Sequence, residues 1–310
     1  MTVPWGESGL PFQRVVVVGF GWLGRVLART LRAHSPSMEI RASTEGGREV
    51  GDAGGGGVVD ELASSGKEIL SGADLVVYTI PLHPTLRLLG EHAEHWDPDT
   101  VITDTAGLKA PVLQRMEELG AGHRYVGGHP VVDSEGPGSD PPDDRGLQGV
   151  RVWMVHGGAP KTHRDNVQAF WEGMGAVPRW TEAGDHDRSV IWGSHLPQIL
   201  AHALAGALDS QGFTPDHLGP LGRELTRPAE SPSAPWKDLF GASGPALAPA
   251  VTSVSRALEV VAGLLQKRDL HTLGEFMEST RRWRQDDGAP EALLGGLGVP
   301  SPDEDAESGG

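Results

Sequence analysis

The chain has 310 residues, with 42 acidic and 26 basic side chains and a formal net charge of −16 at pH 7. This acidity excludes nucleic acid and anionic membrane surfaces as partners, because both require a basic face. No cysteine is present, which excludes disulfides, thiolate metal sites and a cysteine nucleophile.

The histidines and the apolar segments of the chain bear on whether the protein binds a metal or enters a membrane. The 13 histidines include no His-x-x-x-His pair beside a glutamate, so no metal site is expected. Residues 1–12 contain no signal-peptide core, and no apolar stretch approaches the about 20 residues that cross a bilayer. The sequence therefore predicts a cytoplasmic protein without a membrane segment. Its length suits two domains better than one.

A nucleotide-binding turn is predicted near the start of the chain. Residues 15–18 are four valines, typical of a strand buried on both faces, and apolar residues at helical spacing over 22–31 predict a helix. Between them lies the motif Gly19-Phe20-Gly21-Trp22-Leu23-Gly24. In this context the three glycines allow, in order, a tight turn, close approach to a pyrophosphate and packing of helix on strand. The helix start offers N–H groups to the phosphates.

The cofactor preference is read after the second predicted strand, residues 38–42. An acid at its end binds the ribose hydroxyls of NAD. Here that position holds Ser43 or Thr44, with Arg48 nearby in sequence, which suits the 2′-phosphate of NADP. Glu45 is also within reach and favours NAD. The sequence therefore predicts NADP or NAD, with a preference for NADP.

Further strands are predicted at residues 74–80, 100–103 and 150–156. Strands alternating with helices indicate a doubly wound, mainly parallel α/β sheet. Ligands bind beyond the carboxyl ends of such strands, so residues that follow strands are expected to line one crevice. These residues are Ile80, Pro81, Asp104 and His129.

The second half of the chain is predicted to be helical. Helices are expected at residues 186–208, with a kink at Pro197, and at 250–266 and 270–284. We therefore expect a dinucleotide-binding domain over residues 1–180 and a helical domain over 181–287. Residues 288–310 are rich in glycine, proline and acid, which is typical of a disordered tail.

Five short motifs follow one another in a fixed order along the chain. They are the glycine motif, Asp104 with Lys109, Gly128-His129-Pro130, His186-Asp187 with Ser194-His195-Leu196-Pro197, and Leu225-Thr226-Arg227. The series resembles the prephenate and arogenate dehydrogenases over roughly residues 15–284. The resemblance implies a Rossmann-type N-terminal domain, a helical C-terminal domain that forms a homodimer, and a cyclohexadiene carboxylate as substrate.

The resemblance also implies roles for single residues. In this family hydride leaves C4 of the ring for the nicotinamide, a base takes a proton from the C4 heteroatom, and loss of CO2 makes the ring aromatic. His129 corresponds to the catalytic histidine, whose ordinary pKa suits that proton. Arg227 corresponds to the arginine that holds a substrate carboxylate. Asp104 lies beside the nicotinamide, and His186 and His195 belong to the substrate site.

Three positions depart from the family pattern. Gly107 stands where the family has a serine that helps the histidine hold the C4 oxygen, Gln198 replaces a second histidine, and Asp133 stands where a glycine is usual. These changes fit an amino-bearing substrate, arogenate or 4-amino-4-deoxyprephenate, and they equally fit neutral drift in an enzyme for prephenate. Asp133 would pair with a substrate ammonium.

Two other classes share the predicted fold. A reductase of the β-hydroxyacid dehydrogenase type usually relies on a catalytic lysine on a helix and lacks the motifs around His129 and His195. A non-catalytic NAD(P) sensor keeps the glycine turn but needs no base. Fold alone does not decide among them.

Overall fold

The computed structural model describes residues 10–46, 57–132 and 146–285. Arg48, Asp133 and the predicted tail 288–310 lie outside the described residues. The chain forms two compact units. The first runs to Val190 and includes Ser231–Ala242, and the second comprises Ile191–Glu230 and the chain from Ser243 onward. The sequence places the boundary ten residues earlier, at about 180, and each unit is described by itself.

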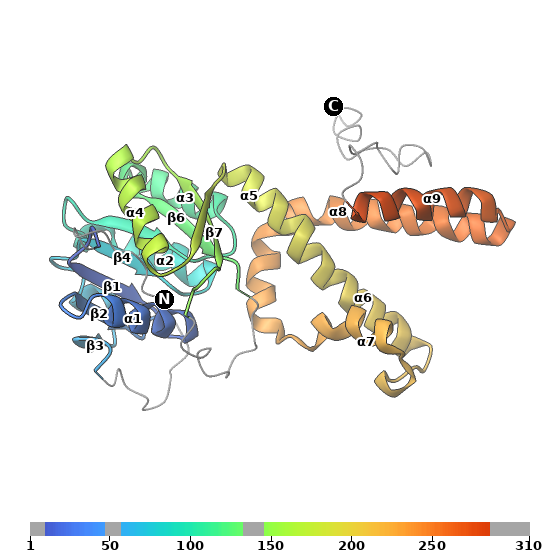
Figure 1. Ribbon diagram of the computed structural model, residues 1–310, viewed down its shortest axis with the longest axis horizontal. Helices are drawn as coiled ribbons and strands as arrows, with labels where there is room; N and C mark the ends of the chain where they lie inside the picture. Colours follow the sequence, from blue (N-terminus) through green and yellow to red (C-terminus); the bar gives the residue numbers. More distant parts are fainter. Residues whose placement is uncertain (1–9, 47–56, 133–145, 286–310) are drawn as a thin grey trace. The chain divides into compact units, whose positions relative to one another are not determined.

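A five-stranded parallel sheet forms the centre of the first unit (Figure 1). Its spatial order is β3-β2-β1-β4-β5. The strands are β1 (Arg14–Val18), β2 (Glu39–Ser43), β3 (Glu61–Ala63), β4 (Leu75–Tyr78) and β5 (Val101–Asp104). The strands predicted over 15–18, 38–42, 74–80 and 100–103 are therefore confirmed, and β3 adds a short edge.

Helices cover both faces of this sheet. They are α1 (Trp22–His34), α2 (Leu82–His92), α3 (Ala110–Glu118) and α4 (Lys161–Gly173). Val15 and Val17 of β1 pack in one core cluster with residues of α1 and α4. Val16 and Val18 pack in the other cluster with residues of α2 and α3. The run of valines thus reads as a strand buried on both faces, as the doubly wound fold requires.

A second sheet of three strands follows, in the order β6-β7-β8. It comprises β6 (Val126–Pro130), β7 (Arg151–His156) and β8 (Val177–Trp180). β6 and β7 are antiparallel, β7 and β8 are parallel, and a bridge between Ile102 and Tyr125 connects the two sheets. His129 lies inside β6, opposite Trp153, and not after a strand as the sequence suggests.

The long helix predicted over 186–208 is interrupted. α5 (Ala183–Val190) leads into a π-helical turn (Ile191–His195), and α6 (Leu196–Ser210) follows. Pro197 lies in the first turn of α6. Its ring lacks an N–H and excludes a regular bond to the carbonyl of residue 193, so the helix rearranges just before it.

Three more helices belong to the C-terminal part (Figure 1). They are α7 (Pro220–Thr226), α8 (Ser233–Lys267) and α9 (Leu270–Arg284). α9 has the predicted bounds, whereas α8 begins well before residue 250 in spite of Pro245 and Pro249.

By length and composition α8 is long enough and apolar enough to cross a membrane, with an 18-residue window of mean hydropathy 1.3 that is 11% buried. This differs from the expectation that no stretch reaches that length. One helix of this length and composition does not by itself assign a membrane.

Candidate active site

The glycine turn between β1 and α1 is shaped by contacts that exclude side chains. Gly19 has φ +96°, and a Cβ there would collide with the side chain of Ile80. A Cβ on Gly24 would collide with the carbonyl oxygen of Gly19. A Cβ on Gly21 would meet nothing within 4 Å among the described atoms. The turn is therefore tight at its two ends and open at Gly21, where a ligand can approach the backbone.

The first turn of α1 suits an anion. Gly21 is the N-cap, no side chain caps it, and the first turn carries no acidic residue. The N–H groups and the positive end of the helix dipole are thus available for phosphates. Arg25 adds a guanidinium on this turn, and its Nε is buried with no hydrogen-bond partner among the described residues. Phe20 is buried, while Trp22 and Leu23 pack against the core. These features fit the pyrophosphate of a dinucleotide.

Ile80 and Pro81 lie at the carboxyl end of β4, as predicted. Ile80 is buried against the glycine turn, and Pro81 is the N-cap of α2. The hydroxyl of Thr85 donates to the Ile80 carbonyl at 3.1 Å and to the Pro81 carbonyl at 2.9 Å, which fixes this edge of the crevice.

The side chains at the end of β2, where the cofactor ribose is expected, differ in their burial and in their hydrogen-bond partners. Ser43 is fully buried and its hydroxyl has no partner among the described residues, while its carbonyl accepts from Gly19 N at 2.9 Å. Thr44 is partly exposed. Glu45 accepts from Gly66 N at 2.6 Å and lies 3.3 Å from Nε2 of the buried His92. Burial lowers the pKa of His92, and the protein itself holds the Glu45 carboxylate.

A buried ion pair connects β5 to β6. The Lys109 ammonium donates to Asp104 Oδ2 at 2.5 Å and to the Gly128 carbonyl at 2.7 Å, and both charged side chains are fully buried. Tyr125 donates its hydroxyl to Asp104 Oδ1 at 2.8 Å. Burial lowers the pKa of Lys109, an effect that the charge of Asp104 opposes, and burial raises the pKa of Tyr125.

This ion pair gives Asp104 a structural position instead of the predicted contact with the cofactor. The sequence predicts contact with the cofactor, but in the structure the Asp104 carboxylate is enclosed by Lys109, Tyr125 and the Ala106 N–H. The pair instead fixes the backbone of Gly128, the residue before His129. The position of Lys109 therefore supports the strand that carries the predicted base.

His129 is the first member of a hydrogen-bonded chain. Its Nδ1 lies 2.9 Å from Nε2 of His186, and Nδ1 of His186 lies 2.7 Å from Oδ1 of Asp187. Asp187 also accepts from Lys109 N at 2.7 Å and Ala110 N at 2.9 Å. An ionised Asp187 fixes the proton of His186 on Nδ1, so His186 Nε2 accepts from His129 Nδ1–H. The basic lone pair of a neutral His129 is then on Nε2.

His186 therefore lies on the Nδ1 side of His129, and only 2% of His186 is exposed to solvent. The family resemblance predicts a place for His186 in the substrate site and no role for Asp187. The motif His186-Asp187 was a signal for both, but its connection to a residue 57 positions away is not visible in the sequence.

Gly107 faces His129. A Cβ on Gly107 would lie 3.9 Å from Nε2 of His129 and 3.5 Å from the side chain of Leu239. Leu239 belongs to the segment Ser231–Ala242, which packs with the first unit, and Asp238 in the same segment accepts from His83 N at 2.9 Å. The sequence does not predict this segment, because no local pattern indicates that the start of α8 packs with the first unit.

The second unit carries the remaining predicted residues. Arg227 is exposed and follows α7 directly. Gln198 is buried and donates to the carbonyl of Pro228 at 2.7 Å, so it holds the turn of Arg227. His195 is buried, with its Nδ1 3.0 Å from the hydroxyl of Ser243. Gln198 thus supports the backbone of the residue after Arg227, and the partner of His195 is Ser243.

Comparisons with known proteins point to one family. Residues 27–179 match the family model "Prephenate dehydrogenase, nucleotide-binding domain". The chain is 24% identical to the cyclohexadienyl dehydrogenase of Zymomonas mobilis over 287 residues, covering 88% of this chain and 95% of that protein. It is also 24% identical over 260 residues to "Probable prephenate dehydrogenase NovF" of Streptomyces niveus, covering 82% of this chain and 68% of that protein.

Solved structures agree on the fold. The prephenate dehydrogenase of Aquifex aeolicus, in complex with hydroxyphenyl propionate and NAD+, superposes with a TM-score of 0.78 at 23% identity, covering 90% of this chain and 99% of that one. The arogenate dehydrogenase of Synechocystis superposes with a TM-score of 0.75 at 20% identity, covering 88% and 99%. The chain belongs to the prephenate and arogenate dehydrogenase family of NAD(P)-dependent oxidoreductases.

Proposed function

We propose that the enzyme oxidatively decarboxylates a cyclohexadiene of the prephenate type, with His129 as the base for the C4 substituent. The observation that carries this proposal is the chain from His129 through His186 to Asp187. A carboxylate at the far end stabilises the imidazolium that forms when His129 takes a proton. A nucleotide sensor needs no such chain, which supports catalysis.

The residues divide the reaction between them. When bound, NAD(P)+ accepts the hydride that leaves C4. Nε2 of His129 takes the proton of the C4 hydroxyl or amino group as the C4 double bond forms. The bond between C1 and its carboxylate then breaks, CO2 leaves, and its electron pair makes the ring aromatic while His129 returns the proton to the C4 heteroatom. Arg227 holds a carboxylate of the substrate through a charged, directional contact.

The substrate is prephenate or an amino analogue, arogenate or 4-amino-4-deoxyprephenate. Gly107 supports an amino analogue, because the position that faces Nε2 of His129 offers no hydroxyl to a C4 oxygen. Measuring NAD(P)H formation with all three compounds under matched conditions tests the proposal. Turnover of none of them would overturn it, and the largest kcat/KM identifies the substrate.

We also propose that NADP is preferred over NAD. Gly66 N donates to Oε2 of Glu45, and His92 Nε2 lies 3.3 Å from the same oxygen, so one carboxylate oxygen is already occupied within the protein, which supports a weaker contact with the ribose hydroxyls of NAD. Thr44 supplies a partly exposed hydroxyl at the same strand end. Dissociation constants for both dinucleotides test this preference, and tighter binding of NAD would contradict it.

The helical unit supports a homodimer. Several large apolar side chains of α8 and α9 are more than half exposed in the single chain. They are Leu258, Leu265, Leu270, Met277 and Trp283. Burying such side chains against a second copy is favourable. Light scattering at micromolar concentration is expected to give the mass of a dimer, and a monomer would refute this arrangement.

A further inference from the structure

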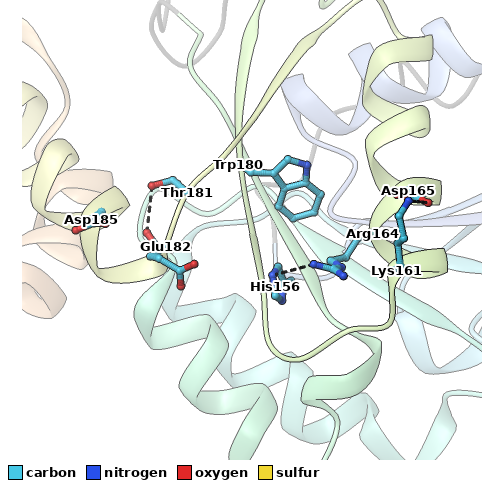
Figure 2. A pocket seen from close by; sticks show the side chains of 8 residues that line it. All are labelled: His156, Lys161, Arg164, Asp165, Trp180, Thr181, Glu182 and Asp185. Carbon is cyan, nitrogen blue, oxygen red and sulfur yellow. Dashed lines mark hydrogen bonds and ion pairs between the residues drawn. The ribbon is translucent and has the colours of Figure 1, made fainter.

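His92 is a fully buried histidine at the end of α2, and the proposed reaction gives it no role. Charged groups in other parts of the first unit are paired at the surface. In the groove beyond β7 and β8, for example, Lys161 donates to Asp165 at 2.6 Å while both side chains remain more than half exposed (Figure 2). Such a pair contributes little. A buried imidazole is costly unless its nitrogens have partners, so the groups around His92 indicate what it does.

A hydrogen bond from β4 fixes the proton of His92. The hydroxyl of Tyr78 lies 3.0 Å from Nδ1 of His92, and both side chains are fully buried. Burial raises the pKa of Tyr78, so the phenol keeps its proton and donates it to Nδ1. The proton of a neutral His92 is therefore on Nε2.

Nε2 of His92 faces the acid that follows β2. It lies 3.3 Å from Oε2 of Glu45, the oxygen that also accepts from Gly66 N at 2.6 Å. Nε2 makes no regular hydrogen bond among the described residues, so this carboxylate is the group available to it. A Cβ on Gly66 would lie 2.6 Å from Cε1 of His92 and 3.3 Å from Oε2 of Glu45. Only a glycine at this position therefore lets the imidazole and the carboxylate come so close to the same N–H group.

Glu45 stands where a dinucleotide-binding fold places the acid for the cofactor ribose, about 20 residues after the glycine motif. Its side chain is 19% exposed, so one side of the carboxylate is open to a ligand. An acid at this position accepts from the ribose hydroxyls of NAD and repels the 2′-phosphate of NADP. A contact that holds Oε2 of Glu45 within the protein therefore weakens both effects.

We propose that His92 is a positioning residue that governs the choice between NAD and NADP through Glu45. With Tyr78 on its far side, His92 directs its Nε2–H at Oε2 of Glu45, keeps this oxygen beside Gly66 and offsets its negative charge near the ribose. This role rests on the proposed binding of NAD(P) beside Glu45. It does not depend on which dinucleotide the wild type prefers, because it concerns how the ratio of the two affinities responds to His92.

Dissociation constants of NAD and NADP, measured by calorimetric titration of the full-length protein without substrate, test this role. His92→Asn keeps an acceptor for Tyr78 but removes the N–H that faces Glu45. We expect the ratio Kd(NAD)/Kd(NADP) to fall by about tenfold, because the released carboxylate binds the ribose of NAD and repels the 2′-phosphate. His92→Gln carries an amide N–H that can reach the position of Nε2, so its ratio should stay within about twofold of the wild type. His95→Asn is the matched control, since it makes the same change at a nearby exposed position.

Glu45→Gln separates an effect through the acid from a general effect on the fold. In this background His92→Asn should change the ratio by less than about twofold, because no carboxylate remains to be released. An equal fall in both backgrounds, or an unchanged ratio in His92→Asn alone, would overturn the role of His92. Tighter binding of NAD than of NADP by the wild type would contradict only the proposed cofactor preference.

The pH dependence supplies a second test that needs no change at His92. The titratable groups that act on His92 are Glu45, Glu91, Lys67 and Tyr78. Burial lowers the pKa of His92, an effect that Glu45 opposes, so His92 gains its charge only as the pH falls below the ordinary range of histidine. That charge then pairs with Glu45.

The ratio Kd(NAD)/Kd(NADP) should therefore rise from about pH 8 to about pH 5.5 in the wild type relative to Glu45→Gln. The 2′-phosphate titrates in the same way with both proteins, so its contribution cancels in this comparison. A ratio that changes equally with pH in the two proteins would refute the role of His92, and this comparison remains decisive if His92→Asn does not fold.

Discussion

Nδ1 of His129 lies 2.9 Å from Nε2 of His186, although 57 positions separate the two residues. The second histidine takes its orientation from Asp187, at 2.7 Å. The proposed base is thus the outer end of a chain whose inner end is an anion fixed by two backbone N–H groups.

Replacing His129 by Asn tests the base directly. We expect kcat to fall by roughly 10²- to 10⁴-fold, the range for loss of a general base, with a small change in KM. Steady-state assays with the best substrate measure both constants. His123→Asn, at an exposed position, is the control, and a His129 variant within a few-fold of the wild type would remove this residue from the mechanism.

Asp187→Asn tests the inner end of the chain. An amide leaves the proton position of His186 unspecified, so we expect kcat to drop by about tenfold or more, with KM much less affected. Because Asp187 accepts from two N–H groups at the start of α3, the variant should also lose about 1 kcal/mol of stability. Asp209→Asn on the exposed side of α6 is the comparison, and equal kcat in both variants would show that Asp187 only stabilises α3.

Lys109→Met tests the ion pair beneath the site. The change leaves the carboxylate of Asp104 buried without its cation, and we expect a loss of about 3–5 kcal/mol in the free energy of unfolding. Urea unfolding measures it. Adding Asp104→Asn should recover part of the loss, since an amide carries no charge and still accepts from Tyr125. A double variant no more stable than Lys109→Met would contradict this account.

Gly107→Ser tests the substrate preference. A Cβ at this position meets only ordinary contacts, at 3.5 Å to Leu239 and 3.9 Å to His129, so the fold should accept the serine. Its hydroxyl would lie near Nε2 of His129, and we expect kcat/KM for prephenate to rise about tenfold relative to the amino analogues. Gly184→Ser on the exposed side of α5 is the control. An unchanged ratio of substrates would indicate that Gly107 reflects drift.

Arg227→Ala tests the carboxylate anchor. We expect KM to rise by roughly one to two orders of magnitude, the scale of a lost charged hydrogen bond, with a smaller effect on kcat. Gln198→Leu should reproduce part of the effect, because Gln198 holds the carbonyl of Pro228 next to Arg227. If Arg227→Ala changes kcat alone, the arginine does not anchor the substrate.

Elements with strong local patterns were predictable from the sequence. The valines of β1 and the periodic apolar residues of α9 specify their elements without help from distant parts of the chain. β6 was not recognised, because Gly127, Gly128 and Pro130 are poor strand residues. Its strand depends on pairing with β7, which no local pattern reveals.

Some residues of the candidate site can also be predicted from local motifs, whereas others depend on tertiary contacts. The glycine turn and His129 stand in recognisable motifs, so they were identified from the sequence. The partners that orient His129, and the return of Leu239 to the first unit, depend on tertiary contacts between residues far apart in the chain. The position of Ser43 in the sequence predicts contact with the cofactor, but its side chain is fully buried, because both faces of the end of β2 are covered.

The carboxylate of Asp187 that orients the two histidines also secures the N-terminus of α3 through Lys109 N and Ala110 N. A mutation of Asp187 that breaks the hydrogen-bonded chain to His129 therefore also destabilises the N-terminus of α3. Purifying selection on folding alone would thus preserve Asp187, even in a descendant that no longer turned over any substrate. Retention of this aspartate in a relative would be evidence of inherited architecture, whereas retention of His129 would be evidence of continued chemistry.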